Sequence, residues 1–266
     1  MPTFPTILQK YKNMIPLALT LLGLIGLVLL FAGGVTYKRS AHREAAIQEL
    51  NLRIANLSPD GDGRAAIAEL GDIITAGKDL NLNLPEAKYA RAWYRRQTAV
   101  DDFKQITTAQ NNRYLATGQQ QELKNFHTRL LALRDSCAIT LEDGKHLPAP
   151  LSWKLHNLKG NVSVMLAYSV LAFEQDGRKG AKFLSDAVDD YKTSIDIVDG
   201  LCSTPMERAL PRWNMELIVG LGEYRRIGLS EVKQQNMTAV QEQLEAFIPD
   251  VAGFAPGVPL ETRVEK

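Results

Sequence analysis

The sequence predicts an all-α protein, with one N-terminal transmembrane helix followed by a soluble helical domain. Three observations predict it. A long uncharged run lies near the N-terminus, apolar residues recur at helical spacing through most of the remaining chain, and strand-like alternation is hard to find. The formal net charge of +1 is ordinary for a globular protein and gives no support for nucleic-acid binding.

The N-terminal run, IPLALTLLGLIGLVLLFAGGVT, begins at Ile15 and ends at Thr36 without a single charge. At about 1.5 Å per residue it is long enough to cross a hydrocarbon core of about 30 Å. A cleaved signal peptide has a shorter apolar region and a small-x-small cleavage site. The run therefore favours a retained single-pass anchor over residues 15–37, after a short tail of residues 1–14.

The charges around the anchor leave its orientation open. Two lysines precede the run and three basic residues follow it, so the positive-inside rule does not decide. The short tail favours export of the body. In an oxidising compartment the two cysteines, Cys137 and Cys202, could pair.

Residues 38–143 form the first part of the body, in which helices are expected over 40–57, 63–80, 86–110 and 118–141. The turn SPDGDG at 58–63 is expected to cap the helix that follows it. The helical spacing also predicts which side chains of the last two helices are buried. They are Tyr89, Trp93, Val100, Phe103, Phe126, Leu130, Leu133 and Cys137.

A linker, EDGKHLPAP at 142–150, separates this region from a helical domain over 151–248. Helices are expected over 151–175, 181–200 and 235–248, with DGRKG at 176–180 as a turn. Thr204 and Glu207 have the form of a capping box, and Pro205 suits the first helical position. Pro211 either kinks that helix or marks a later beginning at Leu210. Residues 249–266 are predicted to be a flexible tail.

The helix over 151–175 contains three poor helix formers, Asn157, Gly160 and Asn161, within an apolar pattern. A glycine there costs about 1 kcal/mol relative to alanine. We expect a partner helix to cross closely at Gly160, where the absent side chain offsets that cost. Asn157 and Asn161, one turn apart, are expected to bind the adjoining helix.

Two segments match each other: AVDDFKQI at 99–106 and AVDDYKTS at 187–194. In both, a small alanine precedes an aromatic residue by one helical turn, so the two lie on one side of a helix. The paired aspartates are expected to face water rather than to form a catalytic dyad.

The alanine–aromatic pattern resembles the second helix of a tetratricopeptide repeat, and HNLKGN followed by AVDDYKTS is similar to such a unit with a lengthened first helix. More specifically, the chain resembles the MxaK-type and BatB-type proteins of bacterial MoxR-associated gene clusters. The segments that carry this resemblance are HNLKGN at 156–161, RWNMEL at 212–217 and AKYARAW at 87–93.

The resemblance implies a tetratricopeptide-like scaffold or assembly factor, anchored in the bacterial inner membrane with a periplasmic body. Its implied partners are von Willebrand A-type proteins and a MoxR-type ATPase system, and its implied role is maturation of a periplasmic dehydrogenase such as methanol dehydrogenase. The candidates for partner binding or for packing within the repeats are Asn157, Gly160, Asn161, Arg212 and Asn214.

An enzyme is not predicted, and neither is a cofactor or a metal site. The sequence has no GxSxG, no phosphate loop and no paired metal ligands. The remaining enzymatic alternative is that packing brings His127 or His156 near a carboxylate. A third alternative is a stoichiometric structural subunit of a membrane complex, in which the glycines of the apolar run permit close helix contact.

Overall fold

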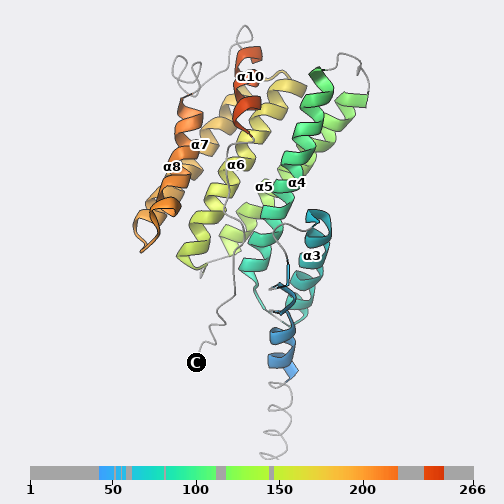
Figure 1. Ribbon diagram of the computed structural model, residues 1–266, viewed down its shortest axis with the longest axis vertical. Helices are drawn as coiled ribbons and strands as arrows, with labels where there is room; N and C mark the ends of the chain where they lie inside the picture. The colour runs from blue at the N-terminus through green and yellow to red at the C-terminus, as the bar shows by residue number, and fades with distance from the viewer. Residues whose placement is uncertain are drawn as a thin grey trace, which may run out of the picture. The chain divides into compact units, whose positions relative to one another are not determined.

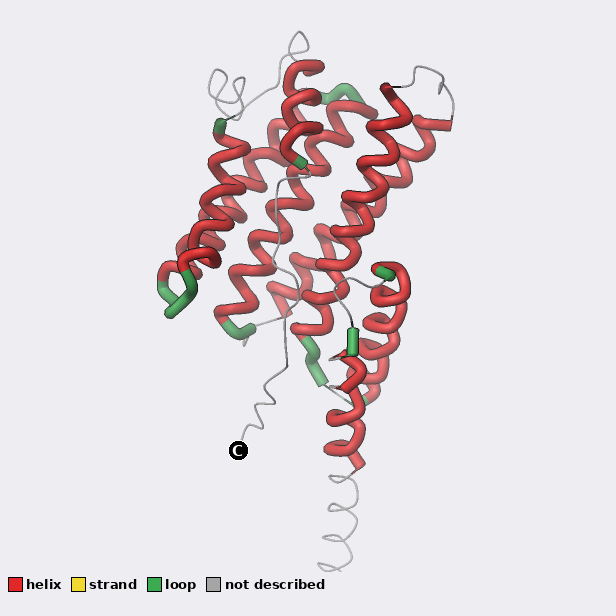
Figure 2. Tube along the Cα trace, viewed as in Figure 1, coloured by secondary structure: helices red, strands yellow, loops and turns green. Residues whose placement is uncertain are grey.

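The computed structural model describes residues 42–50, 52–54, 56–57, 62–80, 82–111, 118–143, 147–220 and 237–248. Every regular element among them is a helix (Figures 1 and 2), which confirms the all-α prediction. The chain folds into two compact units, Met1–Leu52 and Arg53–Lys266. In the first unit, residues 42–50 are helical.

The predicted membrane anchor, residues 15–37, lies outside the described residues. Within the described ranges, no helix has the length and apolar character needed to span a bilayer.

The longer helices of the described chain all lie in the second unit. They are α3 (Gly63–Asp79), α4 (Pro85–Asn111), α5 (Gly118–Asp143), α6 (Ala149–Phe173), α7 (Gly177–Asp199), α8 (Pro205–Val219) and α10 (Met237–Phe247). Each overlaps a predicted helix. The prediction of DGRKG as a turn is wrong in one respect: α7 already begins at Gly177, because the Asp176 carboxylate accepts hydrogen bonds from the first backbone N–H groups of the helix.

Three helices begin at residues whose side chains supply the first hydrogen bonds. Asp62 caps α3, which confirms the predicted cap, whereas residues 58–61 of the predicted turn lie outside the described residues. Thr204 and Glu207 cap α8 reciprocally, so the capping box is also confirmed. The helix runs through Pro211, and the alternative beginning at Leu210 is wrong.

Helices α3 to α8 form a row in which each packs against the next, and α6 is the central member (Figure 1). It also packs against α4 and α10. From Leu151 to Leu171 nearly every side chain of α6 is buried. A helix that is covered on nearly all sides must place its polar residues against partners inside the protein.

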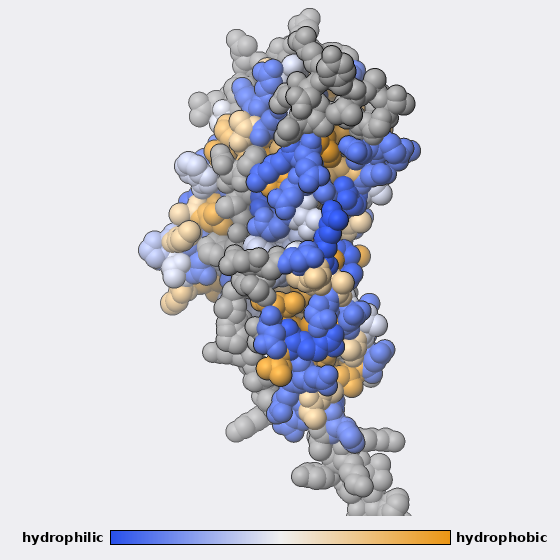
Figure 3. Space-filling model, turned by 45° about the vertical axis from the view of Figure 1, so that its right-hand side comes forward, coloured by the Kyte–Doolittle hydropathy of each residue, from blue (hydrophilic) through white to orange (hydrophobic). Residues whose placement is uncertain are grey.

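The core contains all eight side chains that the spacing of the first part predicted to be buried. Phe103 of α4 contacts two neighbouring helices. The centroid of its ring lies 4.9 Å from that of Tyr168 in α6 and 6.4 Å from that of Phe126 in α5. On the face shown in Figure 3, hydrophilic residues dominate the described surface and hydrophobic residues lie between them in small groups.

The two cysteines are free thiols in the structure. Cys137 is buried in α5, and burial raises its pKa to about 12, which makes it a poor nucleophile. Cys202 is exposed after α7. The bond between them that the sequence allowed is therefore not present.

Candidate functional site

Three buried asparagines join α6 to α8. The Asn214 side-chain amide of α8 donates to the carbonyl oxygens of Asn157, at 3.0 Å, and Asn161, at 3.2 Å. All three side chains are almost completely buried. The expectation that Asn157 and Asn161 bind an adjoining helix is confirmed, and these contacts lie inside the helix row, where they fix α8 against α6.

The close approach expected at Gly160 is also present. A Cβ atom at this position would lie 2.6 Å from Cε1 of Tyr191, so the ring of Tyr191 occupies the space that a side chain would need. The Tyr191 hydroxyl donates to Asn161 at 2.8 Å. Burial raises the pKa of Tyr191 well above its ordinary value, so the hydroxyl stays a donor. We call Asn157, Gly160, Asn161, Tyr191 and Asn214 the asparagine–tyrosine cluster.

Arg212 lies apart from this cluster, although it was predicted with Asn214. Its guanidinium pairs with the carboxylate of Asp199 and donates to the backbone carbonyl of Arg208. It is partly exposed at the junction of α7 and α8. Four of the five predicted residues therefore come together, and Arg212 does not.

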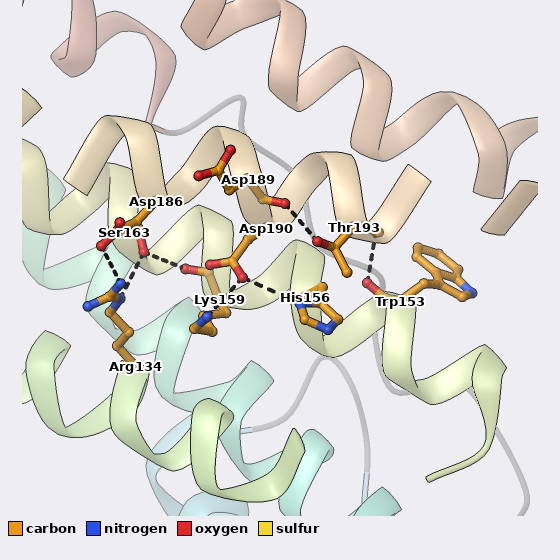
Figure 4. Close-up of polar contacts among 10 residues, drawn as sticks. Arg134, Trp153, His156, Lys159, Ser163, Asp186, Asp189, Asp190 and Thr193 are labelled. Carbon is orange, nitrogen blue, oxygen red and sulfur yellow. Dashed lines mark hydrogen bonds and ion pairs between the residues drawn. The ribbon is translucent and has the colours of Figure 1, made fainter. Parts of the chain in front are cut away.

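A second polar group lies between α5, α6 and α7 (Figure 4), and its centre is Asp190. The carboxylate accepts from Lys159 Nζ at 2.8 Å and faces His156 Nδ1 at 3.3 Å. The prediction that the paired aspartates face water holds for Asp189, which is exposed, and is wrong for Asp190, which is 6% exposed. The next position on a helix points about 100° away, which turns Asp190 toward α6.

Arg134 extends this group from α5. Its guanidinium pairs with Asp186 of α7 and donates to the Ser163 hydroxyl of α6 at 3.1 Å. Three helices are thus held in register by charged side chains at one seam. The cost of removing these charges from water offsets much of their attraction, so the pairs are weak evidence for stability.

Both histidines of the enzymatic alternative lie near a carboxylate, His156 near Asp190 and His127 near Glu174, and His127 also approaches a serine. Its Nδ1 lies 2.8 Å from Ser169 Oγ, and its Nε2 lies 3.6 Å from a carboxylate oxygen of Glu174. However, the Ser169 hydroxyl donates to the Leu166 carbonyl at 2.9 Å and is completely buried. The serine hydroxyl therefore has two neighbours inside the core, the imidazole and this carbonyl.

His127 makes the stability of the protein depend on pH. Burial lowers its pKa, the Glu174 carboxylate opposes this effect, and the Lys179 ammonium adds to it. Because the pKa is lower in the folded chain, the unfolded chain binds the proton more readily, and stability falls as the pH drops below about 6.5. We expect the melting temperature to fall further between pH 7.5 and pH 5 in the wild type than in His127→Gln. Equal losses in thermal melts followed by circular dichroism would contradict this role.

The outer stripe of α8, which we define as Met206, Leu210, Trp213 and Leu217, was not predicted from the sequence. Met206 is 72% exposed and Trp213 is 54% exposed. Pro211, Asn214 and Ile218 define the buried side of this helix, and Trp213 lies on another side, but the sequence pattern of α8 does not show that this other side stays uncovered. In the described part of the chain, α8 packs on α7 and lies at the end of the row (Figure 1).

Comparisons with protein-family models, curated proteins and solved structures found no match. No group of side chains suited to hold a metal ion occurs among the residues that the structure describes. The geometry therefore offers two kinds of feature: buried polar clusters that hold helices together, and one exposed apolar stripe on an edge helix.

Proposed function

We propose that this protein is a membrane-anchored helical-repeat scaffold that acts through contacts with other proteins and not as an enzyme. The observation that carries this proposal is the outer stripe of α8. Single exposed apolar residues are common on protein surfaces. Here two large exposed side chains, Met206 and Trp213, lie seven residues apart on one helix. Half-buried Leu210 lies between them, and half-buried Leu217 follows them.

The position of the stripe strengthens the proposal. Helical-repeat proteins end in capping helices with a polar outer face, because the terminal helix has no neighbour to cover it. The α8 helix ends the described row and exposes Met206 and Trp213 beside polar residues such as Arg208 and Glu216. Tryptophan is also among the residues that contribute most to binding energy at protein interfaces.

The family resemblance suggests which proteins to test as partners. These are a von Willebrand A-type protein and a MoxR-type ATPase, in the maturation of a periplasmic dehydrogenase such as methanol dehydrogenase. Under this proposal the apolar run from Ile15 to Thr36 anchors the chain in the inner membrane, with the body in the periplasm. The tetratricopeptide-like reading is supported by the alanine–aromatic pairs, since Ala99, Phe103, Ala187 and Tyr191 are all buried.

The alternative is a stoichiometric structural subunit of a membrane complex. Purification in mild detergent separates the two. A maturation factor is expected in substoichiometric amounts with its partner, whereas a subunit is expected in a fixed ratio.

Trp213→Ala is expected to weaken partner capture at least tenfold, because truncation of an interface tryptophan costs about 2 kcal/mol or more. Capture of the candidate von Willebrand A-type protein and ATPase by the tagged full-length chain is the measurement. Ile139→Ala is the matched control, since Ile139 is 56% exposed on α5. Equal capture by the two variants would remove α8 from the binding surface.

A further inference from the structure

The last described helix, α10, is held on α6 by one face. Its buried side chains are Met237, Val240 and Leu244, and Ile248 directly after the helix is buried as well. The spacing of three, four and four residues places them on one stripe. Between them, Glu245 accepts a hydrogen bond of 2.7 Å from the Tyr168 hydroxyl of α6.

The α10 helix differs from the helices of the row. It is 11 residues long, and isolated helices of this length are marginal in water, so its structure depends on the surface beneath it. In the row each helix packs against the next along the chain, whereas α10 packs mainly on α6 and residues 221–236, between α8 and α10, lie outside the described ranges. Figure 1 shows α10 in front of α6 and beside the row.

The surface beneath α10 combines apolar contacts with one hydrogen-bond donor. Tyr168 is almost completely buried, and its ring packs edge to face on Phe103 of α4. Burial and the hydrogen bond that the hydroxyl donates to the Glu245 carboxylate raise the pKa of Tyr168 well above its ordinary value, so its hydroxyl remains a donor. Such a surface favours an apolar helix face that carries an acceptor at one fixed position.

We propose that the face of α6 around Tyr168 is a helix-binding groove, which α10 occupies in this structure and an amphipathic helix of a partner protein occupies in its place. The pattern of α10 defines that partner helix: apolar residues at the spacing of Met237, Val240, Leu244 and Ile248, and a carboxylate directly after the third of them. The inference rests on the proposed function, in which the chain binds other proteins. The tethered α10 competes with the partner, so the apparent affinity of the groove is its intrinsic affinity multiplied by the fraction of chains in which α10 is not docked.

The test uses the full-length chain in detergent and a fluorescent peptide with the sequence of residues 237–248, MTAVQEQLEAFI. Leu244→Asp in the chain places a charge under α10 and leaves α6 unchanged, so it is expected to release α10 and open the groove. We expect the peptide to bind this variant at least tenfold more tightly than the wild type, as measured by fluorescence anisotropy. The same peptide with the Leu244→Asp change is expected not to bind.

Ala246→Asp in the chain is the matched control, because it adds the same carboxylate on the exposed side of α10. It should bind the peptide as weakly as the wild type. Adding Tyr168→Phe to the Leu244→Asp chain should weaken binding of the wild-type peptide and not of the peptide with Glu245→Ala, which has no acceptor at this position, so the pair separates recognition of the carboxylate from general apolar binding.

Two results would overturn the proposal. One is the absence of peptide binding by a Leu244→Asp chain that keeps its helix content and its cooperative melt. The other is loss of the whole helical signal in that variant, which would make α10 an integral part of the core. Either result can occur while Trp213→Ala still weakens capture, so failure of the groove and failure of the scaffold function are distinguishable.

Discussion

Replacing Gly160 by leucine is expected to lower the free energy of unfolding by about 3 kcal/mol, in the upper part of the range for overpacked cores. The first carbon atom of a side chain at this position, Cβ, would lie 2.6 Å from Cε1 of the Tyr191 ring. The ring cannot turn aside at low cost, because it is completely buried and its hydroxyl is bonded to Asn161. Room for leucine is available only if α6 and α7 separate.

Gly160→Ala tests whether the contact with Tyr191 costs more stability than the better helix propensity of alanine adds. Alanine improves helix propensity by about 1 kcal/mol, but its methyl group takes the same 2.6 Å position against the ring. We expect a net loss of about 1 kcal/mol. Chemical denaturation followed by circular dichroism measures both variants.

Gly71→Ala in α3 is the matched control for these substitutions. Its Cβ atom would meet the guanidinium end of Arg91 at 3.1 Å, which is the far end of a flexible side chain. The propensity gain should therefore remain, and this variant is expected to be as stable as the wild type or more so. If Gly160→Ala gains stability as Gly71→Ala does, the close approach of Tyr191 does not explain the glycine in α6.

The fold was accessible from the sequence because local signals and burial agree along most of the second unit. The capping residues Asp62 and Thr204 mark the helix beginnings, and the apolar spacing marks the buried faces. Asn157 and Asn161 were recognised as partners of another helix because they interrupt an apolar run, where an unpaired amide is costly. That helix contributes Asn214 to them.

The remaining features depend on distant parts of the chain meeting in space. Helical geometry turns Asp190 and not Asp189 toward α6, but its partner there, Lys159, lies 31 residues earlier in the chain, which the local sequence does not show. The acceptor of the Tyr168 hydroxyl lies 77 residues further along the chain, at Glu245. The exposure of Trp213 follows from the absence of a further helix beside α8 in the described row, which the pattern of α8 alone does not specify.

Asn161→Ala is expected to lower the free energy of unfolding by about 2–3 kcal/mol, a loss second only to that expected for Gly160→Leu. The substitution removes the acceptor of the Tyr191 hydroxyl and one of the two acceptors of Asn214. A buried donor that loses its partner costs about 1–3 kcal/mol, and no solvent reaches this part of the core to replace the bond. Asn157→Ala is the control, because it removes an acceptor of Asn214 and leaves the bond of Tyr191 in place.

A double-mutant cycle with Tyr191→Phe isolates the hydrogen bond itself. In the wild-type background, removal of the hydroxyl should cost about 1 kcal/mol, since Asn161 keeps its bond to Asn214. In the Asn161→Ala background the same change removes a hydroxyl that has lost this acceptor, so it should be neutral or stabilising. The cycle therefore predicts a coupling energy of at least about 1 kcal/mol between positions 161 and 191. Additive losses would show that the two side chains act independently, and the asparagine–tyrosine cluster would then be a set of separate contacts rather than the joint that holds α6, α7 and α8 together.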